Sequence, residues 1–164
     1  MSNPILDIPA SLYYRKFQSG TLTGTSANIT FSGLDGNADG AYLIEISGAM
    51  TGAATEGMFM ACNGTANTVY ALTTLGNSNT LILVNNNRAF ATRIEMPFAA
   101  TGQERGSLMQ GSCTVSAGVG LTSQGSAMYE NTATNITSIA LTWQSGGVFA
   151  VGTKYSISRR QASA

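Results

Sequence analysis

The chain has 164 residues and no net charge at neutral pH, because eight basic and eight acidic side chains balance. Only 10% of the residues are charged, compared with about 25% in ordinary soluble domains. This sparse, balanced charge argues against a basic nucleic-acid surface and against an acidic tail. It leaves two interpretations open, a secreted or adhesive β-protein or a subunit whose surface is largely covered by partners. We favour the covered subunit, because a surface with few ions is easily desolvated.

The first ten residues contain two prolines and no strand pattern, so residues 1–10 are predicted to form an extended arm. Within it, Ile5, Leu6 and Ile8 are the side chains that we expect to lie on a partner. The arm has neither the basic region nor the apolar core of a signal peptide. No run in the sequence reaches the roughly 18 apolar residues of a membrane helix. We therefore expect synthesis in a cytoplasm and no membrane partner.

Alternating apolar and polar residues predict β-strands with one buried face along most of the chain. The clearest case is 88–98, where apolar side chains occupy almost every second position from Phe90 to Phe98. Clusters of Gly, Asn and Asp separate the alternating runs and supply tight reversals. The predicted strands are 11–18, 27–32, 41–50, 57–62, 68–74, 80–85, 88–98, 107–116, 121–129, 137–144 and 147–159, some of which are expected to merge.

No segment shows sustained helical periodicity, and many short strands at even spacing are typical of sandwiches and barrels. The sequence therefore predicts an all-β fold, an antiparallel β-sandwich of about 8–11 strands resembling a jelly roll. We expect one domain over residues 11–160 and a short tail over 161–164.

The sequence contains few of the residues that common catalytic and metal-binding sites require. The absence of histidine removes the commonest general base and the commonest nitrogen ligand, and with them Ser-His-Asp, Cys-His and His-containing zinc sites. Cys62 and Cys113 match no metal or redox spacing and lie in apolar runs. We interpret them as buried thiols, with a disulfide between paired strands as the alternative. No cofactor is expected, and we predict that the protein is not an enzyme.

Paired carboxylates are the one catalytic device that the composition permits, as in glycoside hydrolysis. Glu45 and Glu95 lie mid-strand on the face opposite the apolar residues, where they could line a groove. The simpler interpretation is that both face solvent and that Glu95 pairs with Arg93 or with an arginine across the sheet. The candidate carboxylates are Glu45, Glu56, Glu95, Glu104 and Glu130.

Asp35, Asn37 and Asp39 match the first half of a calcium-binding loop. The position that would need a bidentate Glu is Ile46, so a helix-loop-helix calcium site is rejected. The three residues stay a weak calcium candidate, beside the alternative of an Asx-rich reversal between strands. No other metal site is expected.

Two basic pairs lie near the ends of the chain, Arg15 with Lys16 and Arg159 with Arg160. Aromatic residues accompany the first pair, but a single-stranded nucleic-acid platform needs more positive charge. We therefore expect no nucleic-acid partner, and we interpret these four residues as contacts to a partner protein.

Two segments carry a resemblance to a known group of proteins. The segment from Phe31 to Glu45 (FSGLDGNADGAYLIE) resembles a turn and strand of small structural proteins of tailed bacteriophages. The segment from Gly152 to Arg160 (GTKYSISRR) resembles their last strand. These proteins include head decoration (cement) proteins and tail-associated β-sandwiches.

The resemblance implies a jelly-roll virion component made in a host cytoplasm. It implies partners among the major capsid protein or other virion subunits, and a homo-oligomer, either a dimer or a trimer. The function that we expect from it is capsid decoration by clamping adjacent shell subunits. A tail or baseplate component that binds a receptor is the first alternative. A carbohydrate-binding module or jelly-roll glycosidase is the second.

Overall fold

The computed structural model describes residues 13–52, 55–66, 68–70, 82–97, 99–116, 119–129, 132–143 and 146–161. The expected partner residues Ile5, Leu6 and Ile8 lie outside the described residues, as does the candidate carboxylate Glu130. The boundaries expected for the arm, the domain and the tail therefore stay predictions.

The described part of the chain is built almost entirely from strands, with one short helix, and contains no helix long and apolar enough to span a membrane. The elements are β1 (Arg15–Thr21), β2 (Asn28–Ser32), α1 (Gly36–Asp39), β3 (Ala41–Thr51), β4 (Thr55–Cys62), β5 (Thr65–Ala66), β6 (Thr68–Tyr70), β7 (Ile82–Asn85), β8 (Arg88–Met96), β9 (Arg105–Ser116), β10 (Val119–Tyr129), β11 (Ser138–Trp143), β12 (Val148–Phe149) and β13 (Lys154–Arg160).

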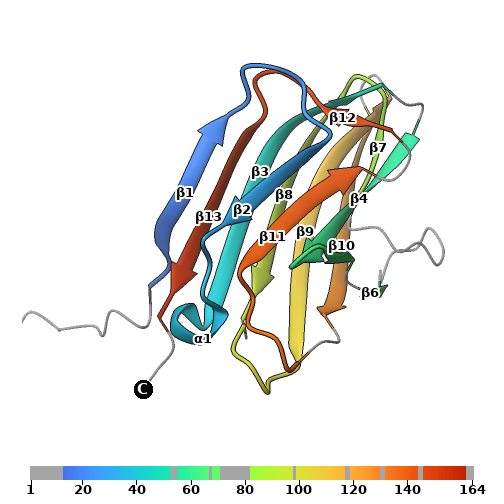
Figure 1. Ribbon diagram of the computed structural model, residues 1–164. Coiled ribbons are helices and arrows are strands. Elements are labelled where there is room, and N and C mark those ends of the chain that lie inside the picture. The colour runs from blue at the N-terminus through green and yellow to red at the C-terminus, as the bar shows by residue number, and fades with distance from the viewer. Residues whose placement is uncertain are drawn as a thin grey trace, which may run out of the picture.

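The strands form two antiparallel sheets that pack face to face (Figure 1). The large sheet has the order β1-β13-β3-β8-β9-β10-β6, with β12 beside β3. The small sheet has the order β2-β11-β4-β5, with β7 beside β4. The predicted antiparallel β-sandwich is therefore confirmed.

The strand pairs nest inside one another, which is the topology of a jelly roll. β1 pairs with β13, β2 with β11, β3 with β8 and β4 with β7, so the chain folds as one long antiparallel hairpin wound into two sheets. This winding places β1-β13-β3-β8 in one sheet and β2-β11-β4-β7 in the other. The β9–β10 hairpin is an addition that extends the large sheet beyond the eight nested strands.

One apolar core lies between the sheets, made by the inward side of each alternating strand. Phe90 of β8 packs edge-on against Trp143 of β11 with ring centroids 5.4 Å apart, and Phe149 of β12 lies 5.1 Å from Trp143. Cys62 and Cys113 are buried thiols that do not form a disulfide, as predicted. Burial raises the pKa of the Cys113 thiol, which favours its protonated form.

The first strand begins and ends later than predicted, at Arg15–Thr21 in place of 11–18. The predicted strand stops before Gly20, yet this glycine lies within β1, directly beside the ring of Tyr155. A Cβ atom on Gly20 would lie 2.6 Å from Cζ of that ring. The pairing of β1 with β13 continues through Gly20, where only a glycine fits because the ring of Tyr155 occupies the space that a side chain would fill.

The strand predicted over 147–159 is divided into β12 and β13 by a turn at 150–153. Thr153 closes this turn, since both its backbone N–H and its hydroxyl donate to the Ala150 carbonyl, at 3.1 Å and 2.8 Å. Gly48 of β3 lies beneath the turn, and a Cβ atom there would lie 2.9 Å from the Cα atom of Thr153. The missing side chain of Gly48 thus allows two backbone segments to approach closely.

We expect Gly48→Ala to lower the free energy of unfolding by about 2 kcal/mol, because the added methyl must push the Thr153 turn away from β3. Urea denaturation measures this change. Gly24→Ala is the matched control, since a Cβ atom on Gly24 would have no neighbour within 4 Å, and it should change stability by less than about 0.5 kcal/mol. Equal stability of the two variants would contradict the close approach at Gly48.

Candidate functional site

The segment proposed as a weak calcium loop forms a capped helical turn, α1, at one end of the sandwich (Figure 1). The Asp35 carboxylate accepts hydrogen bonds from the backbone N–H groups of Asn37 and Ala38 at 3.2 Å and 3.3 Å. The side chain of Asn135 donates to the same carboxylate at 2.9 Å. The Asn135 hydrogen bond, followed by the backbone ones, lowers the pKa of Asp35 below its usual range.

The Asp39 side chain points into the protein, where both of its carboxylate oxygens lie close to hydrogen-bond donors. Its Oδ2 accepts hydrogen bonds from the Tyr42 hydroxyl at 2.9 Å and from the Asp35 backbone N–H at 3.1 Å. Its Oδ1 faces the Arg159 guanidinium at 3.1 Å. Burial, followed by the hydrogen bond from its hydroxyl to Asp39, raises the pKa of Tyr42 above its ordinary value.

The third calcium candidate, Asn37, also uses its side-chain oxygen within the fold, because it accepts a hydrogen bond from the Thr101 backbone N–H at 2.7 Å. No group of three Cys, Asp or Glu residues in the described part of the chain is arranged to hold a metal ion. This loop therefore has the features of the Asx-rich reversal that was the alternative interpretation.

A buried arginine, Arg105, ties together the loops beyond α1. Its guanidinium donates to the carbonyl oxygens of Ala100 at 3.1 Å and of Thr132 at 3.4 Å, and also to the Thr134 carbonyl. It lies 5.7 Å from the centroid of the Tyr129 ring. No sequence pattern indicated this buried charge, which acts as a structural connection between two loops.

The two basic pairs, 144 residues apart in the sequence, come together because β1 and β13 are neighbours. Arg15 lies opposite Arg159 in the register of the two strands. Arg159 stacks on the ring of Phe17 at 4.2 Å and pairs with Asp39, so much of its binding capacity is used inside the fold. Arg160 lies 5.5 Å from the centroid of the Tyr14 ring. Their role as partner contacts stays a prediction.

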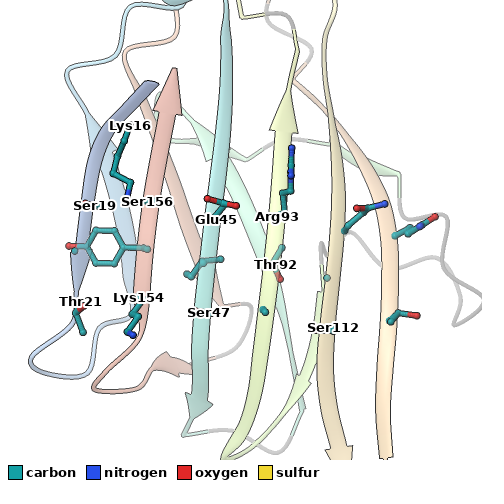
Figure 2. Close-up of a pocket in the computed structure, with 18 residues that line it drawn as sticks. Lys16, Ser19, Thr21, Glu45, Ser47, Thr92, Arg93, Ser112, Lys154 and Ser156 are labelled. Atoms are coloured by element: carbon teal, nitrogen blue, oxygen red, sulfur yellow. The ribbon is translucent and has the colours of Figure 1, made fainter. Parts of the chain in front are cut away.

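The outer face of the large sheet carries a shallow groove of about 780 Å³, and we call this surface the groove face (Figure 2). Strand register aligns its side chains in rows across six strands. The row at its centre is Ser19, Ser156, Glu45, Arg93, Gln110 and Gln124. The next row is Thr21, Lys154, Ser47, Ala91, Ser112 and Thr122.

The groove arises because side chains of different length lie next to one another in these rows. Ser47, Ala91 and Ser112 lie side by side on the three central strands, so the floor is made of short side chains. Longer side chains rise beside it, among them Arg93 from the neighbouring row and Lys154 from β13 (Figure 2). The groove is therefore polar, with hydroxyl, amide and charged groups facing solvent.

Glu45 and Glu95 both reach the groove face, as alternation predicts. Glu95 lies 3.8 Å from Arg93 and accepts a hydrogen bond from the Tyr14 hydroxyl at 2.9 Å, so its predicted pairing with Arg93 is confirmed. Glu45 lies opposite Arg93 in the register of β3 and β8, which makes the two carboxylates diagonal neighbours. Diagonal positions place Cα atoms roughly 7–8 Å apart, close enough for a carboxylate pair.

The other two candidate glutamates that the structure describes lie outside the groove. Glu56 lies on the inward side of β4 and is only 4% exposed. Glu104 is exposed in the connection before β9. Neither lines the groove.

The outer face of the small sheet contrasts with the groove face, and we call it the neutral face. Its side chains come from β2, β11 and β4, and register places Thr30, Ala140 and Ala61 in one row across the three strands. None of its described members is charged. They are Asn28, Thr30, Ser32, Phe59, Ala61, Ser138, Ala140 and Thr142.

The environment of Tyr14 generates a prediction about alkaline pH. Burial, the hydrogen bond to Glu95 and the negative charge of Glu95 raise the pKa of Tyr14 from 10.0 to about 12. The folded protein therefore keeps a proton that the unfolded chain loses, so this contribution to stability is full below pH 10 and falls as the pH rises towards 12.

Absorbance at 295 nm, recorded from pH 9 to 12.5 on the folded protein, measures tyrosine ionisation. The difference between the unsubstituted protein and Tyr14→Phe should appear near pH 12. Tyr13→Phe removes the neighbouring exposed tyrosine and is the control. A Tyr14 transition near pH 10 would contradict the hydrogen bond to Glu95.

Comparison with known proteins finds no relative of this chain. No family model, no curated protein and no solved structure matches this chain. The features of this chain that bear on function are therefore the two faces of the sandwich and the composition.

Proposed function

We propose that this chain is a non-enzymatic structural protein of a virion, a capsid decoration protein that clamps adjacent shell subunits. The observation that carries the proposal is the neutral face. Eight described side chains on three strands form a surface without an ionisable group. Covering such a surface leaves no charge to be desolvated, whereas an ion buried without a partner is costly.

The composition of the neutral face also suits contacts made by shape and hydrogen bonds. Its residues are short hydroxyl, amide and methyl groups, with the half-buried ring of Phe59 at one side. Short side chains lose little conformational freedom when a partner covers them. On a shell with many identical subunits, such modest contacts are repeated, and linked contacts strengthen one another through effective concentration.

A charge placed at the centre of the neutral face tests this docking role. Ala140→Glu introduces a carboxylate between Thr30 and Ala61, and we expect its affinity for particles that lack the protein to fall by at least about tenfold. Co-sedimentation with such particles measures the affinity.

Ala91→Glu is the matched control, because it adds the same charge to an exposed alanine on the groove face. It should retain binding within about twofold. An equal loss in both variants, or in neither, would contradict docking through the neutral face. Circular dichroism checks that both variants are folded.

The proposed clamping role also predicts that the protein stabilises the assembled particle. Particles assembled without the protein should release their contents at lower temperature or under milder osmotic shock than complete particles. Adding the purified protein back should restore their resistance. Unchanged particle stability would contradict the clamping role, but it would not contradict docking through the neutral face.

A tail or baseplate component that binds a receptor is the second candidate, and the groove face is the observation that favours it. A receptor-binding protein needs a recognition surface that stays open after assembly, and the groove offers polar groups from six strands. Electron cryomicroscopy of purified particles separates the two candidates by the position of the protein on the head or on the tail.

The third candidate is a carbohydrate-binding module or a jelly-roll glycosidase, for which Glu45 and Glu95 share one face. Glu95 already accepts a hydrogen bond from Tyr14 and faces Arg93, which suits a structural carboxylate. We expect no hydrolysis of polysaccharide substrates, and unchanged results in Glu45→Gln and Glu95→Gln. Reducing-sugar release that either substitution abolishes would establish the glycosidase instead.

A further inference from the structure

We infer that the groove face binds an acidic oligosaccharide, a chain of saccharide units that carries repeated carboxylate or sulfate groups. Binding there does not depend on the clamp role, because the groove face and the neutral face lie on opposite sides of the sandwich. A protein held by its neutral face would present the groove outward.

The charge of the groove is the first argument. The chain has only two lysines, Lys16 and Lys154, and both line this groove. Both are exposed, and neither has an ion pair or side-chain hydrogen bond with a residue in the described ranges. With Arg93 and Glu45 they give the lining three cations and one carboxylate. When Glu95, which pairs with Arg93 beside the groove, is included, the net charge is +1 in a protein whose total is zero.

The spacing of the cations is the second argument. Lys16 lies on β1 and Lys154 on β13, two side-chain rows apart in the register of these strands, which is roughly 13 Å. Arg93 lies two strands from Lys154 and one row away, roughly 12 Å. No two of these three cations occupy adjacent positions on the sheet. An extended ligand with repeated negative charges reaches all three.

The groups between the cations are the third argument. Hydroxyls and amides face solvent there, including Ser47, Ser112, Gln110 and Gln124. Each offers both donors and acceptors, which match the hydroxyl groups of a saccharide. Glu45 adds an acceptor-only group beside Arg93. A surface that alternates neutral hydrogen-bonding groups with widely spaced cations suits a ligand that alternates hydroxyls with acids.

The same lining favours a saccharide over a single-stranded nucleic acid, the other common extended polyanion. Nucleic-acid platforms stack bases on exposed aromatic rings. Tyr155 is the one aromatic residue among the described lining residues, and its ring packs edge-on against Phe31 at 6.0 Å on the core side. These lining residues therefore offer no aromatic ring to a base.

Titration calorimetry with defined probes tests the inference on the full-length protein. The probes are a hexamer of galacturonic acid, a sulfated heparin hexasaccharide, neutral maltohexaose and a single-stranded deoxythymidine oligonucleotide. We expect at least one acidic hexasaccharide to bind, at least about tenfold more tightly than maltohexaose or the oligonucleotide. Comparing the two acidic hexasaccharides distinguishes carboxylate from sulfate recognition. Affinity should fall as salt is raised, because exposed charges are screened.

The double variant Lys16→Gln/Lys154→Gln should weaken this binding by about tenfold. The control is Arg15→Gln/Arg88→Gln, which removes the same charge from two positions outside the groove lining and should change binding by less than about twofold. All four side chains are exposed or half-buried, so thermal melting should show both double variants folded.

Absence of binding to both acidic hexasaccharides would overturn the inference. Equal binding of maltohexaose, tighter binding of the oligonucleotide, or an equal loss in the two double variants would overturn it too. None of these outcomes bears on particle docking, which Ala140→Glu tests on the opposite face.

Discussion

The nested antiparallel pairing of eight strands is the constraint from which the rest of the structure follows. Each pair fixes a register, and the two-residue period of a strand then decides which side chains enter the core. The remaining side chains are divided between the two outer faces. A slip of β8 by one residue against β3 would send Arg93 into the core and bring Ile94 to the surface. The apolar core thus fixes the groove face and the neutral face together.

The unequal distribution of charge between the two faces affects the desolvation cost of covering each of them. Most of the charged groups in the described part of the sandwich lie on the groove face, on the β1–β13 edge or at the α1 end, where water or fixed donors surround them. On the neutral face, hydroxyl and methyl groups occupy the surface positions instead of charged groups. A protein can therefore bury one face against a neighbour at low desolvation cost while the other stays hydrated.

Much of the fold was predictable from sequence because local alternation and turn chemistry agree. The run around Phe90 shows this, since the buried positions of β8 follow the predicted period. The errors arise where a distant contact overrides the local signal. The first strand was predicted to stop before Gly20, yet its pairing with β13 continues to Thr21, and the glycine makes room there for the ring of Tyr155. The run over 147–159 was predicted as one strand, yet the Thr153 turn divides it above Gly48.

The candidate site was predictable only in part. Alternation placed Glu45 and Glu95 on the solvent side, and the local spacing of Arg93 and Glu95 indicated their pairing. The sequence could not bring Lys16 and Lys154 onto one surface, because their strands are far apart in the chain and meet only through the β1–β13 pairing. For the same reason, no local pattern indicated that Arg105 would be surrounded by loop carbonyls.

The adjacency of β1 and β13 has a mechanical consequence. Arg15, where β1 begins, lies opposite Arg159, near the end of β13. Tension applied at these two points acts across the strands, along their hydrogen bonds, and opens the bonds one after another, like a zipper. Tension spread over a sheet face would instead be shared by many strands at once. The β1–β13 edge is therefore the place where an applied force acts on a single strand pair.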